Sequence, residues 1–258
     1  MILVCPKCKA ELKENGGSLK CENNHSFDVS KEGYVNLLMS QKSGDKTGDS
    51  RASAHARHSF LAKGYYGCLK KAVGERMHGT VLDICCGEGY YDTYDSELYG
   101  FDISKEMVRL AQKSNKGGHY FVANLSHIPI KSESIDTAIH LFAPFNEIEF
   151  CRVLKKDGVL YSVIPGENHL WEMKALLYDK PYKNDEQPPK AQCLELISKT
   201  KVTDKVKIGE EDLKELFSMT PYFYRTSNEN KLRLDGVGEL ELTVDFVILE
   251  YKKAVDKR

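Results

Sequence analysis

The residues best suited to bind a metal ion lie at the start of the chain, in two short pairs. Cys5-Pro-Lys-Cys8 is followed after twelve residues by Cys21-Glu-Asn-Asn-His25, which gives the pattern C-x2-C-x12-C-x3-H. Three thiolates and one imidazole at this spacing are typical of a tetrahedral zinc site, and thiolate ligation excludes magnesium and calcium. Because four protein ligands leave no open position, we predict a structural Zn²⁺ ion.

The segment between the two pairs favours a small hairpin. Gly16 and Gly17 separate short alternating stretches, which predicts the form called a zinc ribbon. A module of this size buries too little surface to fold alone, so we expect the metal to supply much of its folding free energy. The alternative is that the cysteines are ordinary buried thiols and that His25 is a surface residue.

A second stretch, VLDICCGEGYY at residues 81–91, has the composition of a nucleotide-binding turn. An apolar strand ends in a turn where Gly87 and Gly89 leave the backbone free to approach a ligand, and we expect a helix to follow. The dinucleotide fingerprint fails because Asp92 occupies its third glycine position. A P-loop is excluded too, since no Gly-Lys-Ser/Thr follows.

An acidic residue follows this turn at a chemically informative place. Asp102 stands at the end of a second short strand, predicted over Leu98 to Phe101. A carboxylate there accepts hydrogen bonds from both hydroxyls of a ribose. The two features together predict a ligand that contains a ribose, although a Gly-x-Gly turn alone is also common where no ligand binds.

The elements that must position these residues alternate between strand and helix. After the second strand come an amphipathic helix and three further predicted strands, followed near the C-terminus by an antiparallel strand within residues 238–253. Such alternation implies a doubly wound α/β sheet whose ligand crevice lies at the carboxyl ends of the parallel strands. FAPF, residues 142–145, lies at the end of the fourth strand, where Pro144 and Phe145 are candidates for a wall against a bound base; ordinary packing at a strand end is the alternative.

This order of elements resembles the class I S-adenosylmethionine-dependent methyltransferases. That resemblance implies a Rossmann-like, seven-stranded sheet. Four segments extend the resemblance to the RlmA-type ribosomal RNA guanine-N1-methyltransferases, which combine an N-terminal zinc ribbon with such a domain. These segments are CPKC with CENNH, then FDVSKEGYVNLL, then CGEGYY, and finally PGENHLWEMK.

Carried over to this sequence, the family pattern implies both sets of ligands. The metal ligands would be Cys5, Cys8, Cys21 and His25. The residues that bind S-adenosylmethionine would be Tyr66, Asp83, Cys85, Gly87, Glu88, Gly89, Asp102, Asn124, Leu125 and His169. Tyr66 and His169 have the alternative of ordinary packing or surface roles.

The sequence also departs from the family pattern. Cys85 stands where the loop usually has glycine, and the segment before Asp102 is shortened and poor in helix formers. No catalytic base is named: Glu147 and Glu167 are near in sequence, but exposed glutamates are common. The Pro-rich insertion at residues 178–190 is either a mobile rim of the target cleft or an idle surface loop.

The resemblance implies methyl transfer to N1 of a guanine in a hairpin of 23S rRNA, by a protein that forms a homodimer. Two alternatives stay open, a small-molecule acceptor and a degenerate RNA-binding module without catalysis. Lys+Arg 37 against Asp+Glu 38 gives no global basic field, so any RNA-binding surface must be local.

Length and composition predict a cytoplasmic protein with an appended module. The 258 residues divide into a zinc ribbon (1–38), a basic linker (39–58) and a methyltransferase domain (59–258). No apolar run is long enough for a membrane span, and the N-terminus lacks the pattern of a signal peptide. In a reducing compartment the isolated cysteines, Cys68, Cys151 and Cys193, are ordinary small apolar residues.

Overall fold

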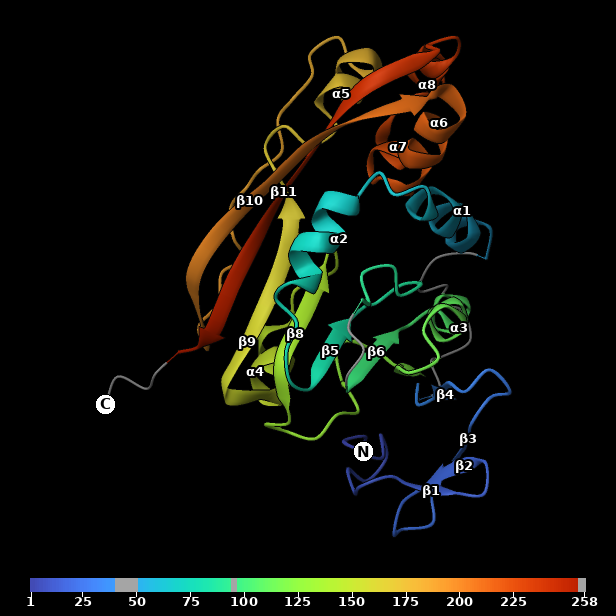
Figure 1. Cartoon of the computed structure of the whole chain (residues 1–258), viewed down its shortest axis with the longest axis vertical. Helices are drawn as coiled ribbons and strands as arrows, with labels where there is room; N and C mark the ends of the chain where they lie inside the picture. Colours follow the sequence, from blue (N-terminus) through green and yellow to red (C-terminus); the bar gives the residue numbers. More distant parts are fainter. Residues whose placement is uncertain (40–50, 94–96, 255–258) are drawn as a thin grey trace.

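The computed structural model describes residues 1–39, 51–93 and 97–254. Its centre is an eight-stranded mixed sheet in the order β10-β11-β9-β8-β5-β6-β7-β4 (Figure 1). The parallel strands of the domain are β5 (Val81–Ile84), β6 (Leu98–Asp102), β7 (His119–Val122), β8 (Ile135–Leu141) and β9 (Leu154–Pro165). They confirm the predicted doubly wound α/β sheet.

Strand burial explains why these segments pair in parallel. All four residues of β5 and the first four of β6 are buried, as expected where helices cover both faces of a sheet. The long strands β10 (Leu194–Gly209) and β11 (Glu239–Lys253) are antiparallel to each other, and β11 is antiparallel to β9. The predicted C-terminal antiparallel strand is therefore confirmed.

The sheet has eight strands, so the expectation of seven was wrong. The additional strand is β4 (Val35–Asn36), which pairs in parallel with β7 and places Val35 opposite Phe121. The backbone N–H of Leu37 also donates to the carbonyl of Val122 at 2.9 Å. Val35 and Leu37 are buried, so the N-terminal region covers the edge of the sheet and shares its core.

The helix expected after the glycine-rich turn is absent from the described residues between β5 and β6, which are 85–93 and 97. Tyr90 and Tyr91 form a turn in this connection. Asp92 secures it instead, because its carboxylate accepts a hydrogen bond from the hydroxyl of Tyr120 at 2.6 Å.

Helices cover the sheet and gather at one end of it (Figure 1). Beside the sheet lie α2 (Gly67–Gly74), α3 (Lys105–Ser114) and α4 (Glu147–Val153). At the end toward which the parallel strands point lie α1 (Arg51–Ala62), α5 (Trp171–Leu177), α6 (Glu210–Met219), α7 (Tyr222–Arg225) and α8 (Asn228–Lys231).

The segment predicted as a basic linker, residues 39–58, has two parts. Residues 40–50 lie outside the described residues, and residues 51–58 form most of helix α1 rather than a linker. Among the helices that the structure describes, none is both long and apolar enough to cross a membrane.

Candidate metal centre and cofactor cavity

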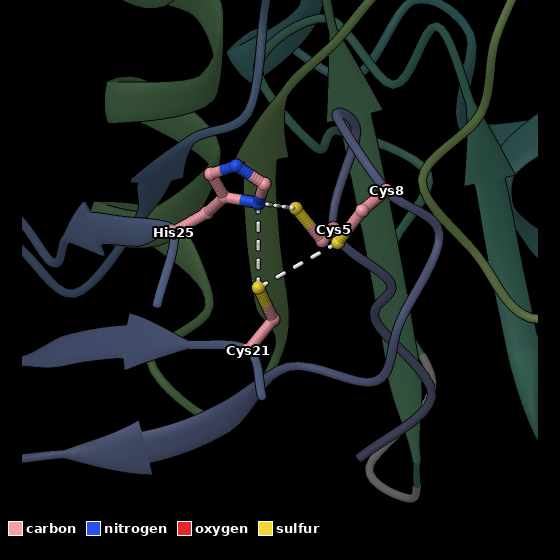
Figure 2. A group of neighbouring side chains, drawn as sticks. All are labelled: Cys5, Cys8, Cys21 and His25. Atoms are coloured by element: carbon pink, nitrogen blue, oxygen red, sulfur yellow. Dashed lines mark hydrogen bonds between the residues drawn. The ribbon is translucent and has the colours of Figure 1, made fainter. Parts of the chain in front are cut away.

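The four predicted metal ligands converge at one point (Figure 2). Their ligand atoms all lie within 4.8 Å of one another. His25 Nδ1 is 3.4 Å from Cys5 Sγ and 3.5 Å from Cys21 Sγ, and Cys8 Sγ is 3.7 Å from Cys21 Sγ. Ligands at the usual zinc distances form a tetrahedron with edges of about 3.8 Å, so this set fits Zn²⁺.

Two tight turns hold these ligands. The first places Lys9 in the left-handed region (φ 63°), and the second does the same with Asn24 (φ 61°). The small sheet of β1 (Lys13–Asn15), β2 (Ser18–Lys20) and β3 (Ser26–Asp28) joins and braces the turns. A hydrogen bond from the Asn23 side chain lowers the pKa of the Cys8 thiol to about 6, which favours the thiolate that binds metal.

A cavity of about 470 Å³ opens at the carboxyl ends of the parallel strands. The turn after β5, the ends of β8 and β9, and the segments around α6 and α7 line it. Six residues predicted to bind the cofactor share this wall: Tyr66, Asp83, Cys85, Gly87, Glu88 and His169. The other four, Gly89, Asp102, Asn124 and Leu125, are not part of its lining.

The two glycines of the turn serve different purposes. Gly87 has φ 56°, and an added Cβ would meet nothing within 4 Å, so its backbone faces open space at the cavity. Gly89 has φ 73°, but its Cβ would lie 3.1 Å from the Cβ of Ala111 in α3. The absence of a side chain at Gly89 thus permits close packing against a helix.

Asp102 connects the turn to the neighbouring strand. Its carboxylate accepts hydrogen bonds from the backbone N–H of Gly87 at 3.2 Å and of Ser104 at 2.8 Å. At the end of the next strand, Asn124 Oδ1 accepts from the N–H of Ser126 at 2.9 Å. These oxygens lie beside the cavity along the sheet, where an extended ligand would continue.

Asp83 is the most buried carboxyl group of the cavity wall, with 1% of its surface exposed. Neither carboxylate oxygen has a hydrogen-bond donor among the described residues. Burial, reinforced by the nearby Asp92, raises the pKa of Asp83 well above its usual value. A buried carboxyl group without a hydrogen-bond donor among the described residues thus lies beneath the turn.

Tyr66 and His169 meet on the opposite wall. Tyr66 Oη lies 3.4 Å from His169 Nε2, and the ring centroids are 5.8 Å apart. The backbone N–H of Asp245 donates to His169 Nδ1 at 3.2 Å. Burial lowers the pKa of His169 to about 3, so the imidazole is neutral and carries its proton on Nε2.

The FAPF turn contributes two aromatic residues to the cavity. Phe145 lines it, as expected, while its ring also packs at 5.1 Å from Phe150 and 5.7 Å from Tyr251. Pro144 is not part of the lining. Phe142 also lines the cavity, is 46% exposed and adopts φ 54°. An aromatic residue held in this strained, exposed position is the better candidate for contact with a ligand.

Sequence reasoning missed His140, which holds the FAPF turn. It is buried in β8, with Nδ1 3.0 Å from Ser162 Oγ and Nε2 3.1 Å from the carbonyl of Pro144. Burial lowers the pKa of His140 to about 4, so Nε2–H donates to Pro144 and Nδ1 accepts from Ser162. A histidine within an apolar strand was the one signal available in the sequence.

The glutamates considered as bases lie elsewhere. Glu147 accepts from the backbone N–H of Gln192 at 2.6 Å, and Glu167 pairs with Lys183 at 2.9 Å. Neither side chain lines the cavity.

Comparisons with known proteins agree with both parts of the chain. The family model described as RlmA, N-terminal, matches residues 3–46, and a methyltransferase domain model matches residues 82–162. The 23S rRNA (guanine(748)-N(1))-methyltransferase of Streptomyces fradiae is 28% identical over 95% of each chain. YxjB of Bacillus subtilis (strain 168) is 29% identical, also over 95% of each chain.

Among solved structures, the YcgJ protein of Bacillus subtilis covers 77% of this chain and 100% of its own, with a TM-score of 0.43 and 17% identity. The sheet, the glycine-rich turn and the cavity define a class I S-adenosylmethionine-dependent methyltransferase with a zinc-binding N-terminal module. The match to the RlmA N-terminal model and the similarity to the two 23S rRNA guanine-N1-methyltransferases over 95% of the chain confirm the resemblance stated from its sequence.

Proposed function

We propose that this protein transfers the methyl group of S-adenosylmethionine to N1 of a guanine in a hairpin of 23S rRNA. The observation that carries the proposal is similarity over 95% of the chain to the Streptomyces fradiae enzyme, which includes the N-terminal module as well as the catalytic domain. A methyltransferase with a small-molecule acceptor has no evident need for the zinc module.

The cavity residues receive the cofactor in this proposal. Tyr66, Asp83, Cys85, Gly87, Glu88 and His169 would contact it within the cavity, and Gly89, Asp102, Asn124 and Leu125 would support or extend that site along the sheet. The zinc ribbon at 1–38 and the catalytic domain at 59–258 would both contact RNA, in a homodimer. These assignments rest on the family pattern and on the grouping of six of the ten residues.

The bound cofactor supplies an electrophilic methyl group. The protein's task is then to hold guanine N1 in line with it and to exclude water. The target guanine must leave its stacked position to enter the cavity, where Phe142 offers an exposed ring. His140 takes no part as a base, because both of its ring nitrogens are engaged.

Primer extension would test the proposal directly. A methyl group on N1 blocks Watson–Crick pairing, so reverse transcriptase should stop one nucleotide before the modified guanine of an unmethylated 23S rRNA treated with protein and cofactor. A single cofactor-dependent stop within a hairpin supports the proposal. Methyl consumption without any stop or labelled RNA would contradict it and favour a small-molecule acceptor.

A further inference from the structure

Lys174 in α5 is a fully buried lysine at the edge of the cavity site. Its exposed fraction is 0%, and no carboxylate forms an ion pair with it among the described residues. Buried lysines without an acidic partner are rare, because taking an ammonium out of water is costly. Burial lowers the pKa of Lys174 to about 8, so the ammonium persists at neutral pH.

Carbonyl groups and aromatic faces take the place of a counter-ion. The ammonium donates to Asn184 Oδ1 at 2.6 Å and to the carbonyl of Tyr182 at 3.1 Å. It also lies 4.7 Å from the ring centroid of Tyr182 and 4.8 Å from that of Tyr222. Such cation–π contacts strengthen where water is excluded. Two of these partners belong to the Pro-rich insertion, residues 178–190.

Asn184 connects the ammonium of Lys174 to residues of the cavity wall. Its Oδ1 also accepts from the hydroxyl of Tyr222 at 2.7 Å, while its Nδ2 donates to the carbonyls of Gly166 at 2.9 Å and His169 at 3.2 Å. The hydrogen-bonding capacity of the amide is therefore fully used. Tyr222 and His169 both line the cavity, on elements that are distant in sequence.

We propose that Lys174 and Asn184 are positioning residues, which hold Tyr222 and His169 at the cavity wall and fasten the 178–190 insertion as its fixed rim. Pro189 of the insertion lines the same cavity, so the rim borders the site directly. The inference rests on the proposed function, since it assigns these residues to the placement of cofactor and guanine.

The choice of lysine supports a positioning role over a merely stabilising one. An apolar side chain of similar length, such as methionine, would fill the same space without the cost of burying a charge. The ammonium instead joins three separate segments, α5, the insertion and α7, through directional contacts. These directional contacts fix the positions of α5, the insertion and α7 relative to one another. Apolar packing alone would fix them less well.

The test compares Lys174→Met with Lys174→Arg and with Lys180→Met, an exposed lysine of the same insertion. For Lys174→Met we expect kcat/KM for RNA methylation to fall about 10-fold or more, as for loss of charged hydrogen bonds. We also expect faster trypsin cleavage after Lys183 or Lys190. Lys174→Arg should recover part of the kcat/KM and part of the resistance to trypsin. Lys180→Met should match the wild type in both measurements.

The proposal fails if Lys174→Met keeps wild-type kcat/KM and cleavage rates, or if it lowers only the melting temperature. Should Lys174→Met not fold, Tyr222→Phe removes only the hydroxyl bond to Asn184, and an unchanged kcat/KM would then overturn the proposal. Failure of the proposed function is distinct: the wild type itself would not methylate RNA. In that case cleavage rates and S-adenosylmethionine affinity of the same variants still decide the role of Lys174.

Discussion

At the scale of single residues, Cys85 shows a strain that the family pattern avoids. It adopts φ 59° in the turn after β5, a conformation that costs a side-chain-bearing residue about 1 kcal/mol or more. A cysteine is small enough to be accepted there, and its pKa is raised to about 12 by burial, so it is an unreactive thiol.

The backbone strain at Cys85 can be measured by comparing the stability of two variants. Cys85→Val places a β-branched residue at positive φ and should lower the free energy of unfolding by about 1 to 2 kcal/mol relative to Cys85→Gly. Urea denaturation of the two proteins measures the difference. Equal stability would show that the turn relaxes to another conformation and that the strain is not real.

The buried His140 should make the folding stability of the protein depend on pH in the acid range. Its pKa is about 4 when folded against an ordinary 6.5, so the unfolded chain binds the proton more readily. Through His140, the free energy of unfolding therefore has its full value above pH 6.5 and decreases as the pH falls from 6.5 toward 4. His169, with a folded pKa of about 3, acts in the same direction.

His140→Gln should flatten part of this acid dependence, because glutamine does not titrate. Unfolding free energies of the wild type and the variant at pH 7, 5.5 and 4.5 would measure it. A wild type whose stability stays constant over this range would refute the burial of neutral histidines.

At the level of secondary-structure elements, the glycine-rich turn packs against α3 on one side and borders the cavity on the other. Substitutions at Gly89 and Gly87 should affect these two sides separately. Gly89→Ala brings a Cβ to 3.1 Å from Ala111 of α3 at φ 73°, so it should destabilise the fold by about 2 kcal/mol or more. Gly87→Ala meets open space, so it should cost only the backbone strain while weakening cofactor binding.

Thermal melting and isothermal titration with S-adenosylmethionine would distinguish these two effects. Gly87→Ala should show the larger loss of affinity and Gly89→Ala the larger loss of stability. The reverse order would mean that the ligand lies against Gly89 instead.

The zinc ribbon and strand β4 should respond differently to metal removal. The two ligand turns depend on the ion, so chelation should expose the amides of Lys9 and Asn24 to hydrogen exchange. The amide of Leu37 should stay protected, because its acceptor is Val122 of the sheet. Loss of protection at all three amides would show that β4 depends on the metal as well.

Local patterns predicted much of this fold, and long-range contacts account for what they missed. The metal ligands and the apolar runs of β5 and β8 have short-range signatures, so spacing and periodicity revealed them. Strand β4 has only two residues, and its pairing with β7 is set by contacts distant in sequence. The network of Lys174 and Asn184 likewise joins elements whose proximity no local pattern encodes.

At the scale of the whole molecule, the zinc ribbon lies at the opposite end from helices α5 to α8 (Figure 1). The cavity opens at the carboxyl ends of the parallel strands, which point toward those helices. An RNA that contacts both the zinc ribbon and the cavity must extend along the protein. The formal charge of −1 means that affinity must come from local contacts.

Salt dependence should therefore be moderate. If the substrate is RNA, the Kd for an unmethylated hairpin should rise steadily between 50 and 200 mM salt, because phosphate contacts release counterions. The affinity for S-adenosylmethionine should change much less. Filter binding and calorimetry would measure the two, and a salt-independent Kd for RNA would argue against phosphate contacts.

The central claim is best tested by the identity of the methylated nucleoside. Labelled S-adenosylmethionine and unmethylated 23S rRNA would be incubated with the wild type or with Asp102→Ala, and the RNA digested to nucleosides for chromatography. We expect label in 1-methylguanosine for the wild type and a strong loss for Asp102→Ala, whose carboxylate connects the turn to β6. Label in another nucleoside, or none despite bound cofactor, would overturn the proposed function.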